Sequence, residues 1–591
     1  MQAHGSGGAM IKKAVLMVMS IVVSLVYPIS ALAYSGSGDG SVGSPYLIST
    51  CDELQEMRDN LDANYRLTDD INCNLVGLTW EPIGFDTGFP FTGTFDGDNY
   101  TIYNLAYSGG MYAGLFGNVF EATLKNVTLA SANITSTGMV GVLAGTTLDS
   151  TIQNVNVSNS VVYSELNAGG LVGILQSTTL SDSAAYNTYV SGRSPASFGN
   201  QLGGLVGVSI GSTIDRVSSS GGAVTPNSEA LGSSNRFGGL IGSSISDVIS
   251  DSYSAVEVSG DDNIGGFIGF ASSTAATRSY ASGDVSGNTN VGGLVGYGAL
   301  TGIDHSFATG ATSNSGDNTI GGVIGHADGA GATTTGSTWD VTRTGQTDCV
   351  GLDDTISVHP VCSGVNVSNA DSSYFFNNIS NTPFDQWDFD TVWQTTTDLP
   401  ILITTPDRAD NVSVVRTATT LGVRWGVPAT TGGSAITSYD LKYRPSGAVT
   451  STVVLGLPAN NPSQYTISGL SPDTEYTVEL RAHNDRGAGI WTGFITTTLA
   501  PAIIPPTTTT GPAKTISPVD DTQVTEEMTP IETPDATTDI ATTQAPQTAQ
   551  ADATDEAGTT SSLTPILITI GVIVGLAILI WIIRLLKSRS S

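Results

Sequence analysis

Charged residues are scarce in this sequence, and the basic ones are the scarcest. Lys, Arg, Asp and Glu make up 13% of the 591 residues, with 21 Lys and Arg against 53 Asp and Glu, so the formal net charge is −32. Binding to nucleic-acid phosphates requires clustered Lys and Arg. The composition therefore excludes a nucleic-acid partner and, with 70 glycines, favours a turn-rich, all-β protein.

Histidine is also rare, which limits the catalytic chemistry that can be expected. None of the 5 His residues is followed by Glu, so there is no HExxH zinc motif. Polysaccharide lyases and glycosidases need carboxylates that converge with basic residues or with each other, but residues 34–405 contain only eight scattered Arg and Lys. We therefore expect no catalytic residues, no cofactor-binding residues and no metal ligands, and predict that the chain is not an enzyme.

The 4 cysteines lie in two sequence-local pairs. Disulfides persist in proteins outside the cell. Of the three possible connectivities we favour Cys51 with Cys73 and Cys349 with Cys362. A metal site is the alternative, although no CxxC spacing is present.

The first residues resemble a secretion signal. Lys12 and Lys13 precede an apolar run over residues 14–26 and an A-x-A-like cleavage site at residues 31–33. We therefore predict a signal peptide over residues 1–33.

A second apolar segment lies near the other end of the sequence. Residues 565–583 form an uncharged run of 19 residues, long enough to cross the hydrocarbon core of a bilayer, and three basic residues follow. We predict a transmembrane helix over residues 564–586, a cytoplasmic tail over 587–591, and a single-pass protein of the cell membrane with its N-terminal region extracellular. Residues 499–563, rich in Thr, Pro and acid, are predicted to form a disordered stalk.

A glycine-rich motif, seen as NVGGLVGYG at residues 290–298, recurs through the first two thirds of the chain. The glycines that close its copies are 27 to 35 residues apart: Gly117, Gly145, Gly173, Gly207, Gly242, Gly269, Gly296 and Gly325. A period of this size indicates a solenoid or a propeller.

A second column decides between the two folds. Seven residues after each closing glycine stands an aliphatic residue: Leu124, Ile152, Leu180, Ile214, Ile249, Ala276, Ile303 and Ala332. Two or three short strands fit such a repeat, whereas a propeller blade needs four strands and about 40 residues. We predict a parallel β-helix, or β-solenoid, of about eight coils, in which the glycines take positive φ and let neighbouring backbones approach closely.

The GGLVG motif in a repeat of this length resembles the GLUG motif of large bacterial surface proteins, including adhesins and some secreted peptidases. The likeness extends over roughly residues 35–405. It implies an N-terminal capping segment at 34–110, repeats over 111–335 and a C-terminal capping segment at 336–405. We expect the aromatic residues after the last repeat to cap its end. The resemblance implies an architecture rather than a reaction.

Residues 406–498 resemble a fibronectin type III domain. Trp425 has the place of the core tryptophan, SYDLKYR at 438–444 is predicted to be a strand, and Tyr476 has the place of the corner tyrosine, whose hydroxyl bonds nearby backbone. Such a domain serves as a spacer or a protein-binding module.

Two consecutive repeats are about seven residues longer than the others, and the additions lie at residues 191–201 and 224–237. Insertions at matching places in adjacent coils project side by side, and such a face often binds ligands. We predict a ligand-contact patch of Arg193, Phe198, Asn200, Gln201, Glu229, Asn235 and Arg236. Two tolerated surface loops are the alternative.

No cofactor is expected, although Asp261, Asp262, Asn263, Asp317 and Asn318 leave calcium open as an alternative to solvated turns. The features together predict a bacterial surface protein that mediates adhesion or recognition without catalysis. Its partner would be a glycan or protein on a host or neighbouring cell. The alternatives are a polysaccharide-binding or polysaccharide-degrading β-helix and a structural component of a surface coat.

Overall fold

A computed structural model describes residues 34–501 and 525–527 of this chain. Short gaps fall at 75–79, 86–87, 194–198, 228–234, 317–318, 330, 356–358, 368–373, 377, 430, 447, 449–450, 460–462 and 490. The predicted signal peptide, most of the predicted stalk, the transmembrane helix and the tail lie outside the described residues. Within the described part of the chain, no helix has the length and apolar character needed to cross a membrane.

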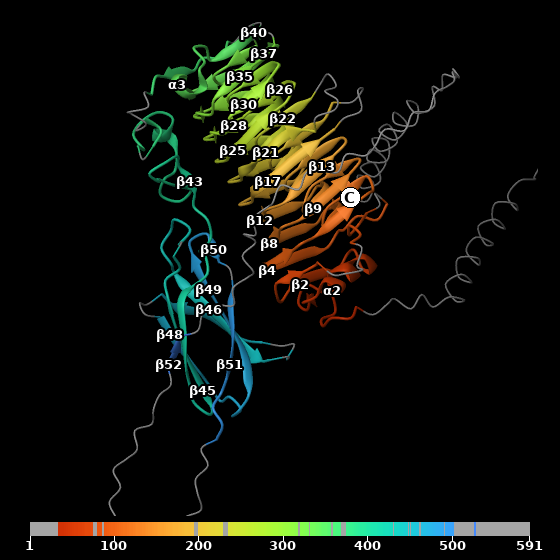
Figure 1. Ribbon diagram of the computed structural model, residues 1–591, viewed down its shortest axis with the longest axis vertical. Helices are drawn as coiled ribbons and strands as arrows, with labels where there is room; N and C mark the ends of the chain where they lie inside the picture. The colour runs from red at the N-terminus through yellow and green to blue at the C-terminus, as the bar shows by residue number, and fades with distance from the viewer. Residues whose placement is uncertain are drawn as a thin grey trace, which may run out of the picture. The chain divides into compact units, whose positions relative to one another are not determined.

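The larger part of the described chain is a stack of parallel coils, a β-solenoid, as predicted. Figure 1 shows the coils following one another from β4 and β8 to β37 and β40. Each coil contributes strands to three parallel sheets, whose members pair with the equivalent strands of the coils before and after.

The strands of the three sheets have the following bounds. One sheet contains β6 (Tyr112–Ala113), β10 (Met139–Val140), β14 (Asn167–Gly169), β18 (Gln201–Gly203), β22 (Arg236–Gly238), β26 (Asp262–Gly265), β31 (Thr289–Gly292) and β36 (Ile320–Gly321). A second contains β7 (Phe116–Phe120), β11 (Ala144–Leu148), β15 (Val172–Gln176), β19 (Val206–Ile210), β23 (Ile241–Ile245), β27 (Ile268–Ser272), β32 (Val295–Ala299), β37 (Ile324–Gly329) and β40 (Val350–Thr355). The third contains β1 (Tyr46–Ile48), β2 (Asn64–Leu67), β3 (Ile71–Asn72), β4 (Thr94–Tyr103), β5 (Ala106–Ser108), β8 (Thr123–Ala130), β9 (Asn133–Ser136), β12 (Thr151–Ser158), β13 (Val161–Ser164), β16 (Thr179–Ser181), β17 (Ala184–Gly192), β20 (Thr213–Asp215), β21 (Ser218–Pro226), β24 (Val248–Ser250), β25 (Tyr253–Ser259), β28 (Ala275–Thr277), β29 (Tyr280–Ala281), β30 (Val285–Gly287), β33 (Gly302–Asp304), β34 (Phe307–Ala308), β35 (Thr312–Asn314), β38 (Thr333–Thr335), β39 (Thr338–Asp340) and β41 (Ser363–Val365).

The core consists of apolar ladders that run along the stack. In one of them Ile241, Ile268, Val295 and Ile324 stand in register on successive strands, and all four are fully buried. Each such side chain contributes about 1.5–3 kcal/mol on burial. The ladders therefore tie each coil to its neighbours.

The predicted aliphatic column is a core ladder, but its last member is wrong. Ile303 pairs with Thr334 rather than with Ala332, because two extra residues lengthen the turn between β37 and β38. The solenoid is also longer than about eight coils. The sheet that begins with β7 has nine strands, and β1, β2 and β4 stack ahead of the first glycine motif.

The motif glycines have only one of their two predicted roles. A Cβ added to Gly292 would lie 2.0 Å from the Val295 carbonyl oxygen, and one on Gly296 would lie 2.6 Å from backbone atoms of Asn263 and Gly269. Close approach of backbones therefore excludes any side chain. Positive φ is found instead at polar corner residues such as Asn154, Asn263 and Asn290, because a short amide side chain tolerates the left-handed region.

The two ends of the solenoid are closed by short helices and disulfides. At the first end α2 (Cys51–Glu56) begins with a capping box between Thr50 and Glu53 and continues into the 3-10 helix η1 (Met57–Asp59). At the other end α3 (Val341–Thr344) is capped by Asp340. The structure contains the disulfides Cys51–Cys73 and Cys349–Cys362, the pairs favoured from the sequence.

Most aromatic residues that were expected to cap the last coil lie along the side of the solenoid instead. The rings of Tyr253, Tyr280 and Phe307 stack on successive coils. Trp387 and Trp393 pack over this stack, and the latter continues into the hairpin β42 (Trp393–Gln394) and β43 (Ile401–Leu402). The segment that contains η3 (Phe384–Gln386) thus covers three coils laterally.

The remaining described residues form a two-sheet sandwich. One sheet has β44 (Asp410–Arg416), β45 (Thr420–Gly426), β48 (Ser463–Ser468) and β52 (Thr525–Glu527), and the other has β46 (Ser438–Pro445), β47 (Thr452–Pro458), β49 (Glu475–Asn484), β50 (Gly487–Ala488) and β51 (Thr492–Thr497). Trp425 is buried in the core, and the Tyr476 hydroxyl accepts a 3.0 Å bond from the Ser471 N–H. Both predicted roles are confirmed.

Candidate functional site

One face of the sandwich carries alternating charges that the sequence pattern would leave in solvent. On β46 and β49 the cross-strand pairs are Asp440 with Arg481 and Lys442 with Glu479. Alternation along a strand places all four on the same face, away from the apolar core. Even so, Lys442 and Glu479 are each only 7% exposed.

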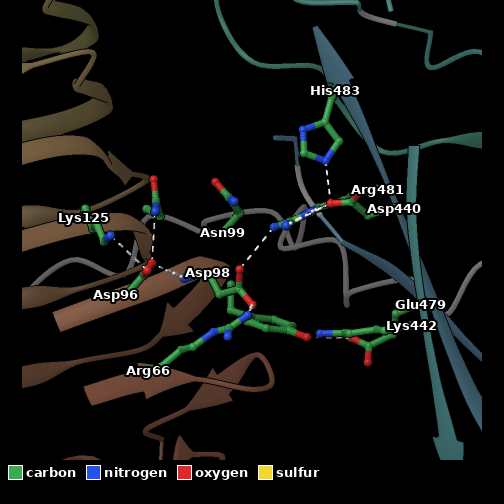
Figure 2. Close-up of polar contacts among 12 residues, drawn as sticks. Arg66, Asp96, Asp98, Asn99, Lys125, Asp440, Lys442, Glu479, Arg481 and His483 are labelled. Atoms are coloured by element: carbon green, nitrogen blue, oxygen red, sulfur yellow. Dashed lines mark hydrogen bonds and ion pairs between the residues drawn. The ribbon is translucent and has the colours of Figure 1, made fainter. Parts of the chain in front are cut away.

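The solenoid strand β4 covers this charged face. Figure 2 shows Asp98 directed at Arg481 of β49. Arg481 donates to Asp98 at 3.1 Å, and the Tyr100 hydroxyl donates to Glu479 at 2.8 Å. Arg66 also pairs with Asp98, at 2.5 Å. Solenoid and sandwich therefore meet through buried polar contacts.

Aromatic rings complete this junction. The Lys442 ammonium lies 4.4 Å from the centroid of Tyr100 and 4.3 Å from that of Trp491, and it pairs with Glu479 at 3.2 Å. Burial lowers the pKa of Lys442 and raises the pKa of Glu479. Each charge therefore depends on the other for its stability in the junction.

Asp440 is the acceptor that holds the basic residues of β49 in place. It accepts from both Arg481 and His483, the latter at 2.6 Å. Burial opposes the ionisation of Asp440, but hydrogen bonds from His483 and Gly456 and the nearby guanidinium outweigh it, so the pKa of Asp440 lies below its usual value. The Arg481 guanidinium is thus directed at the solenoid.

Beside this junction lies a cleft of about 680 Å³, the candidate functional site. Its walls come from the solenoid, from the hairpin segment around residues 401–405 and from the loops of the sandwich. Its polar lining includes Asn99, Asn126, Gln153, Asn154, Asn156, Asp182, Arg216, Arg481 and Arg486. Amide and guanidinium groups dominate this lining, and they can donate and accept hydrogen bonds in fixed geometry.

The amide groups on the solenoid wall form a ladder. The Asn154 amide donates to the side-chain oxygens of Asn99, at 3.0 Å, and Asn126, at 3.1 Å. All three have positive φ, so the coil corners fix the side chains in position. The cleft therefore has a floor whose donors and acceptors are arranged before any ligand arrives.

The structure describes five of the seven residues of the predicted contact patch, and these lie in two different environments. Asn200 and Asn235 are buried inside the stack, where the Asn200 N–H donates to the Asn235 side chain at 3.0 Å. The prediction that they contact a ligand at the surface is wrong for this reason. Phe198 and Glu229 lie outside the described residues.

The other three predicted residues are at the surface of the solenoid. Gln201 and Arg236 are register partners on β18 and β22, and the Arg236 guanidinium lies 3.8 Å from the centroid of Phe270. The Arg193 N–H donates to the Ser164 carbonyl oxygen. None of the three lines the cleft, so the elongated repeats and the cleft are separate surfaces.

The charged residues of the junction could have been suspected from the sequence in one respect. Both SYDLKYR and the VELRAH segment of β49 alternate charged with apolar residues, which predicts an outward charged face. Nothing in the pattern shows that another domain covers that face, since the partner strand β4 is more than 300 residues away. The described residues hold no cluster of three His, Cys, Asp or Glu fit for a metal ion.

Two family models match parts of this chain. Residues 406–498 match the fibronectin type III domain, which confirms that prediction, and residues 48–159 match the N-terminal region of the M26 IgA1-specific metallo-endopeptidases. The second match points toward peptidase function and contradicts the prediction that the chain is not an enzyme. The likeness to GLUG repeats stays a prediction.

Two curated relatives match a short part of the chain. Halomucin of Haloquadratum walsbyi is 37% identical over 110 residues, which is 17% of this chain and 1% of that protein. A protein described as a candidate Gly-rich membrane protein of Evansella cellulosilytica is 36% identical over 110 residues, again 17% of this chain and 13% of its own length. The chain therefore spans a small fraction of these curated relatives.

Solved structures also resemble parts of the fold. Titin domains A168–A170 align over 17% of this chain and 35% of theirs, with 24% identity and a TM-score of 0.15. A candidate immunoglobulin A1 protease from Bacteroides ovatus aligns over 62% of this chain and 94% of its own, with 18% identity and a TM-score of 0.36. Scores this low support no inference about function.

Proposed function

We propose that this chain is a surface recognition protein whose solenoid and fibronectin type III domain together form a ligand-binding cleft. The observation that carries the proposal is the cleft of about 680 Å³ lined by amide and guanidinium groups. Concave sites of this size with a few fixed polar groups are the usual places where proteins bind small ligands. The partner we propose is a glycan or protein of a host or neighbouring cell.

The junction beside the cleft supports this proposal. Tyr100, Lys442, Glu479 and Trp491 fill the space between the two domains and are largely buried. A site formed between two domains keeps its shape only if those domains are held together, and a preorganised site loses less entropy on binding. The buried contacts meet that requirement.

The proposal keeps several sequence-based elements as its own assumptions. The chain would be exported by the segment over residues 1–33, anchored in the membrane by residues 564–586, and used for adhesion as GLUG-type surface proteins are. The exposed Arg193 and the half-buried Gln201 and Arg236 would form a second contact area. No cofactor is required for this role.

Substitutions in the cleft test the proposal. Gln153 and Thr151 are both exposed on β12, but only Gln153 lines the cleft. Gln153→Trp should fill the cleft and abolish binding to a glycan and protein array, while Thr151→Trp, two positions along the same strand, should leave binding intact. Equal binding by both variants would contradict a role for the cleft.

A second candidate function comes from the match of residues 48–159 to the metallo-endopeptidase region. We propose that the solenoid serves a peptidase by holding a protein substrate. Incubation of the full chain with immunoglobulin A1, with and without a metal chelator, tests this. Chelator-sensitive cleavage would establish a peptidase, and binding without cleavage would establish substrate recognition alone. The absence of both cleavage and binding would rule this candidate out.

A further inference from the structure

Arg486 stands out among the cleft residues because two nitrogens of its side chain make no hydrogen bond within the described structure. Its Nε and one terminal nitrogen are shielded from solvent, and neither makes a hydrogen bond within the described structure. Burial lowers the pKa of Arg486, and the charge of Arg216 adds to this effect. Shielded guanidinium nitrogens without an acceptor are costly, so this position needs an explanation.

The backbone around Arg486 is fixed. Its N–H donates to the Asn484 side chain at 2.8 Å, and the Asn484 amide donates to the carbonyl oxygens of Thr404 and Thr431, at 2.8 and 2.9 Å. Asn484 therefore ties the loop that carries Arg486 to two other segments that line the cleft, at Thr404 and at Thr431. The side chain of Arg486 is offered to the cleft from a rigid position.

Asp182 lines the same cleft as Arg486 and is paired with another cation. Asp182 accepts two hydrogen bonds from Arg216, at 2.7 and 2.9 Å, in a bidentate pair. Such a pair places both oxygens of Asp182 in hydrogen bonds to one guanidinium. Arg216 also contacts Asp215.

Asp251 and Asp388, which also act electrostatically on Arg486, accept hydrogen bonds from other groups. Asp251 accepts from Arg278, at 2.6 and 2.8 Å, and from the Trp393 indole at 3.0 Å. Asp388 accepts from the N–H and the hydroxyl of Thr391, at 2.9 and 2.5 Å. Arg486 therefore lines the cleft while the carboxylates of Asp182, Asp251 and Asp388 accept hydrogen bonds from other groups.

We infer that the cleft takes a carboxylate-bearing saccharide, with the sugar carboxylate on Arg486 and the sugar hydroxyls on the amide ladder of Asn99, Asn126 and Asn154. A guanidinium binds a carboxylate through two parallel hydrogen bonds. Side-chain amides pair a donor with an acceptor, as neighbouring hydroxyls of a sugar do. This inference rests on the proposed function and names the ligand class of the same cleft.

The experiment measures the affinity of the full chain for sialyl, glucuronyl and galacturonyl oligosaccharides and for their neutral methyl esters. We expect at least one acid to bind about tenfold or more tightly than its ester, the gain of one charge-assisted contact. Arg486→Gln should remove that preference, Arg486→Lys should keep part of it, and Arg424→Gln, an exposed change on β45 outside the cleft, should leave it unchanged.

The other outcomes distinguish a failure of this inference from a failure of the proposed function. If no acid binds more tightly than its ester, or if Arg486→Gln keeps the preference while circular dichroism shows a folded chain, the inference is overturned. Equal binding of a polyglutamate peptide would show that charge alone is read and would also overturn it. If neutral saccharides bind the wild-type chain and this binding is lost in Gln153→Trp, the proposed function stands and the acidic ligand is ruled out. Binding that Gln153→Trp leaves unchanged would remove both.

Discussion

The Tyr100 hydroxyl donates a 2.8 Å hydrogen bond to Glu479, which joins two residues that lie 379 positions apart in the sequence. The bond crosses from the solenoid to the fibronectin type III domain and is buried. Glu479 accepts at the same time from Lys442. Through this hydrogen bond, the solenoid strand β4 supports the wall of the cleft that β49 forms.

Removing the hydroxyl should loosen this junction. Tyr100→Phe keeps the ring under Lys442 and leaves Glu479 paired, so only one hydrogen bond is lost, at a cost of about 1 kcal/mol. Faster hydrogen exchange of the β49 amides in the variant would report it. Tyr189→Phe, which changes an exposed tyrosine of the solenoid, should have no effect, and equal exchange in the two variants would contradict a role for the bond.

Breaking the buried ion pair should cost more than breaking the hydrogen bond. Lys442→Met leaves the Glu479 carboxylate buried without its cation, which costs about 3–5 kcal/mol. The double variant Lys442→Met with Glu479→Gln should recover most of the loss, because no charge then stays unpaired. Urea unfolding of Lys442→Met, Glu479→Gln and the double variant measures this, and losses that add would show that the two side chains do not interact.

The pH dependence of Lys442→Met has a definite sign. The pKa of Glu479 is raised above its usual 4.5 by burial, and loss of Lys442 raises the pKa further. A folded state that holds the proton more tightly is favoured below pH 4.5 and loses stability as pH rises through the folded pKa. Lys442→Met should therefore approach wild-type stability in acid.

The sequence predicts the folded domains well and the cleft poorly, for a physical reason. The interval from Gly296 to Ile303 is local, and so are the Trp425 and Tyr476 signals, because each depends on turns and core positions within one repeat or one domain. The two extra residues before Thr334 are not evident from the sequence, because Ala332 is also apolar and fits the same seven-residue interval. The cleft depends on which faces of two domains meet, and no periodicity encodes that.

Asp247 should contribute stability to the solenoid in acid that is lost at higher pH. It occupies a buried column in which other coils have a hydroxyl, such as Ser150 and Thr178, whose side chain accepts an N–H from the coil before. Burial raises the pKa of Asp247 above 3.8, despite hydrogen bonds from Ser244 and the Ser212 N–H. Because the folded state holds the proton more tightly, Asp247 favours folding below pH 3.8 and loses that contribution as pH rises through its folded pKa.

Replacing this carboxylate isolates its effect. Asp247→Thr should gain stability relative to wild type between pH 3 and pH 7, as followed by the free energy of unfolding in urea. Asp59→Thr, at an exposed position of η1, controls for the general titration of the chain. A difference between Asp247→Thr and wild type that stays constant with pH would show that the buried carboxylate does not titrate in this range.

Two glycines of NVGGLVGYG should respond in opposite ways to the same substitution. A Cβ on Gly296 would lie 2.6 Å from backbone atoms of two neighbouring coils, whereas a Cβ on Gly298 would find its nearest atom 3.6 Å away, at Thr301. Gly296→Ala should therefore destabilise the solenoid by about 1–3 kcal/mol. Gly298→Ala should be neutral or stabilising by about 0.4–1 kcal/mol, since neither glycine has positive φ and alanine restricts the unfolded chain. Thermal unfolding of both variants measures the contrast, and equal midpoints would refute close backbone approach as the reason for the glycine at 296.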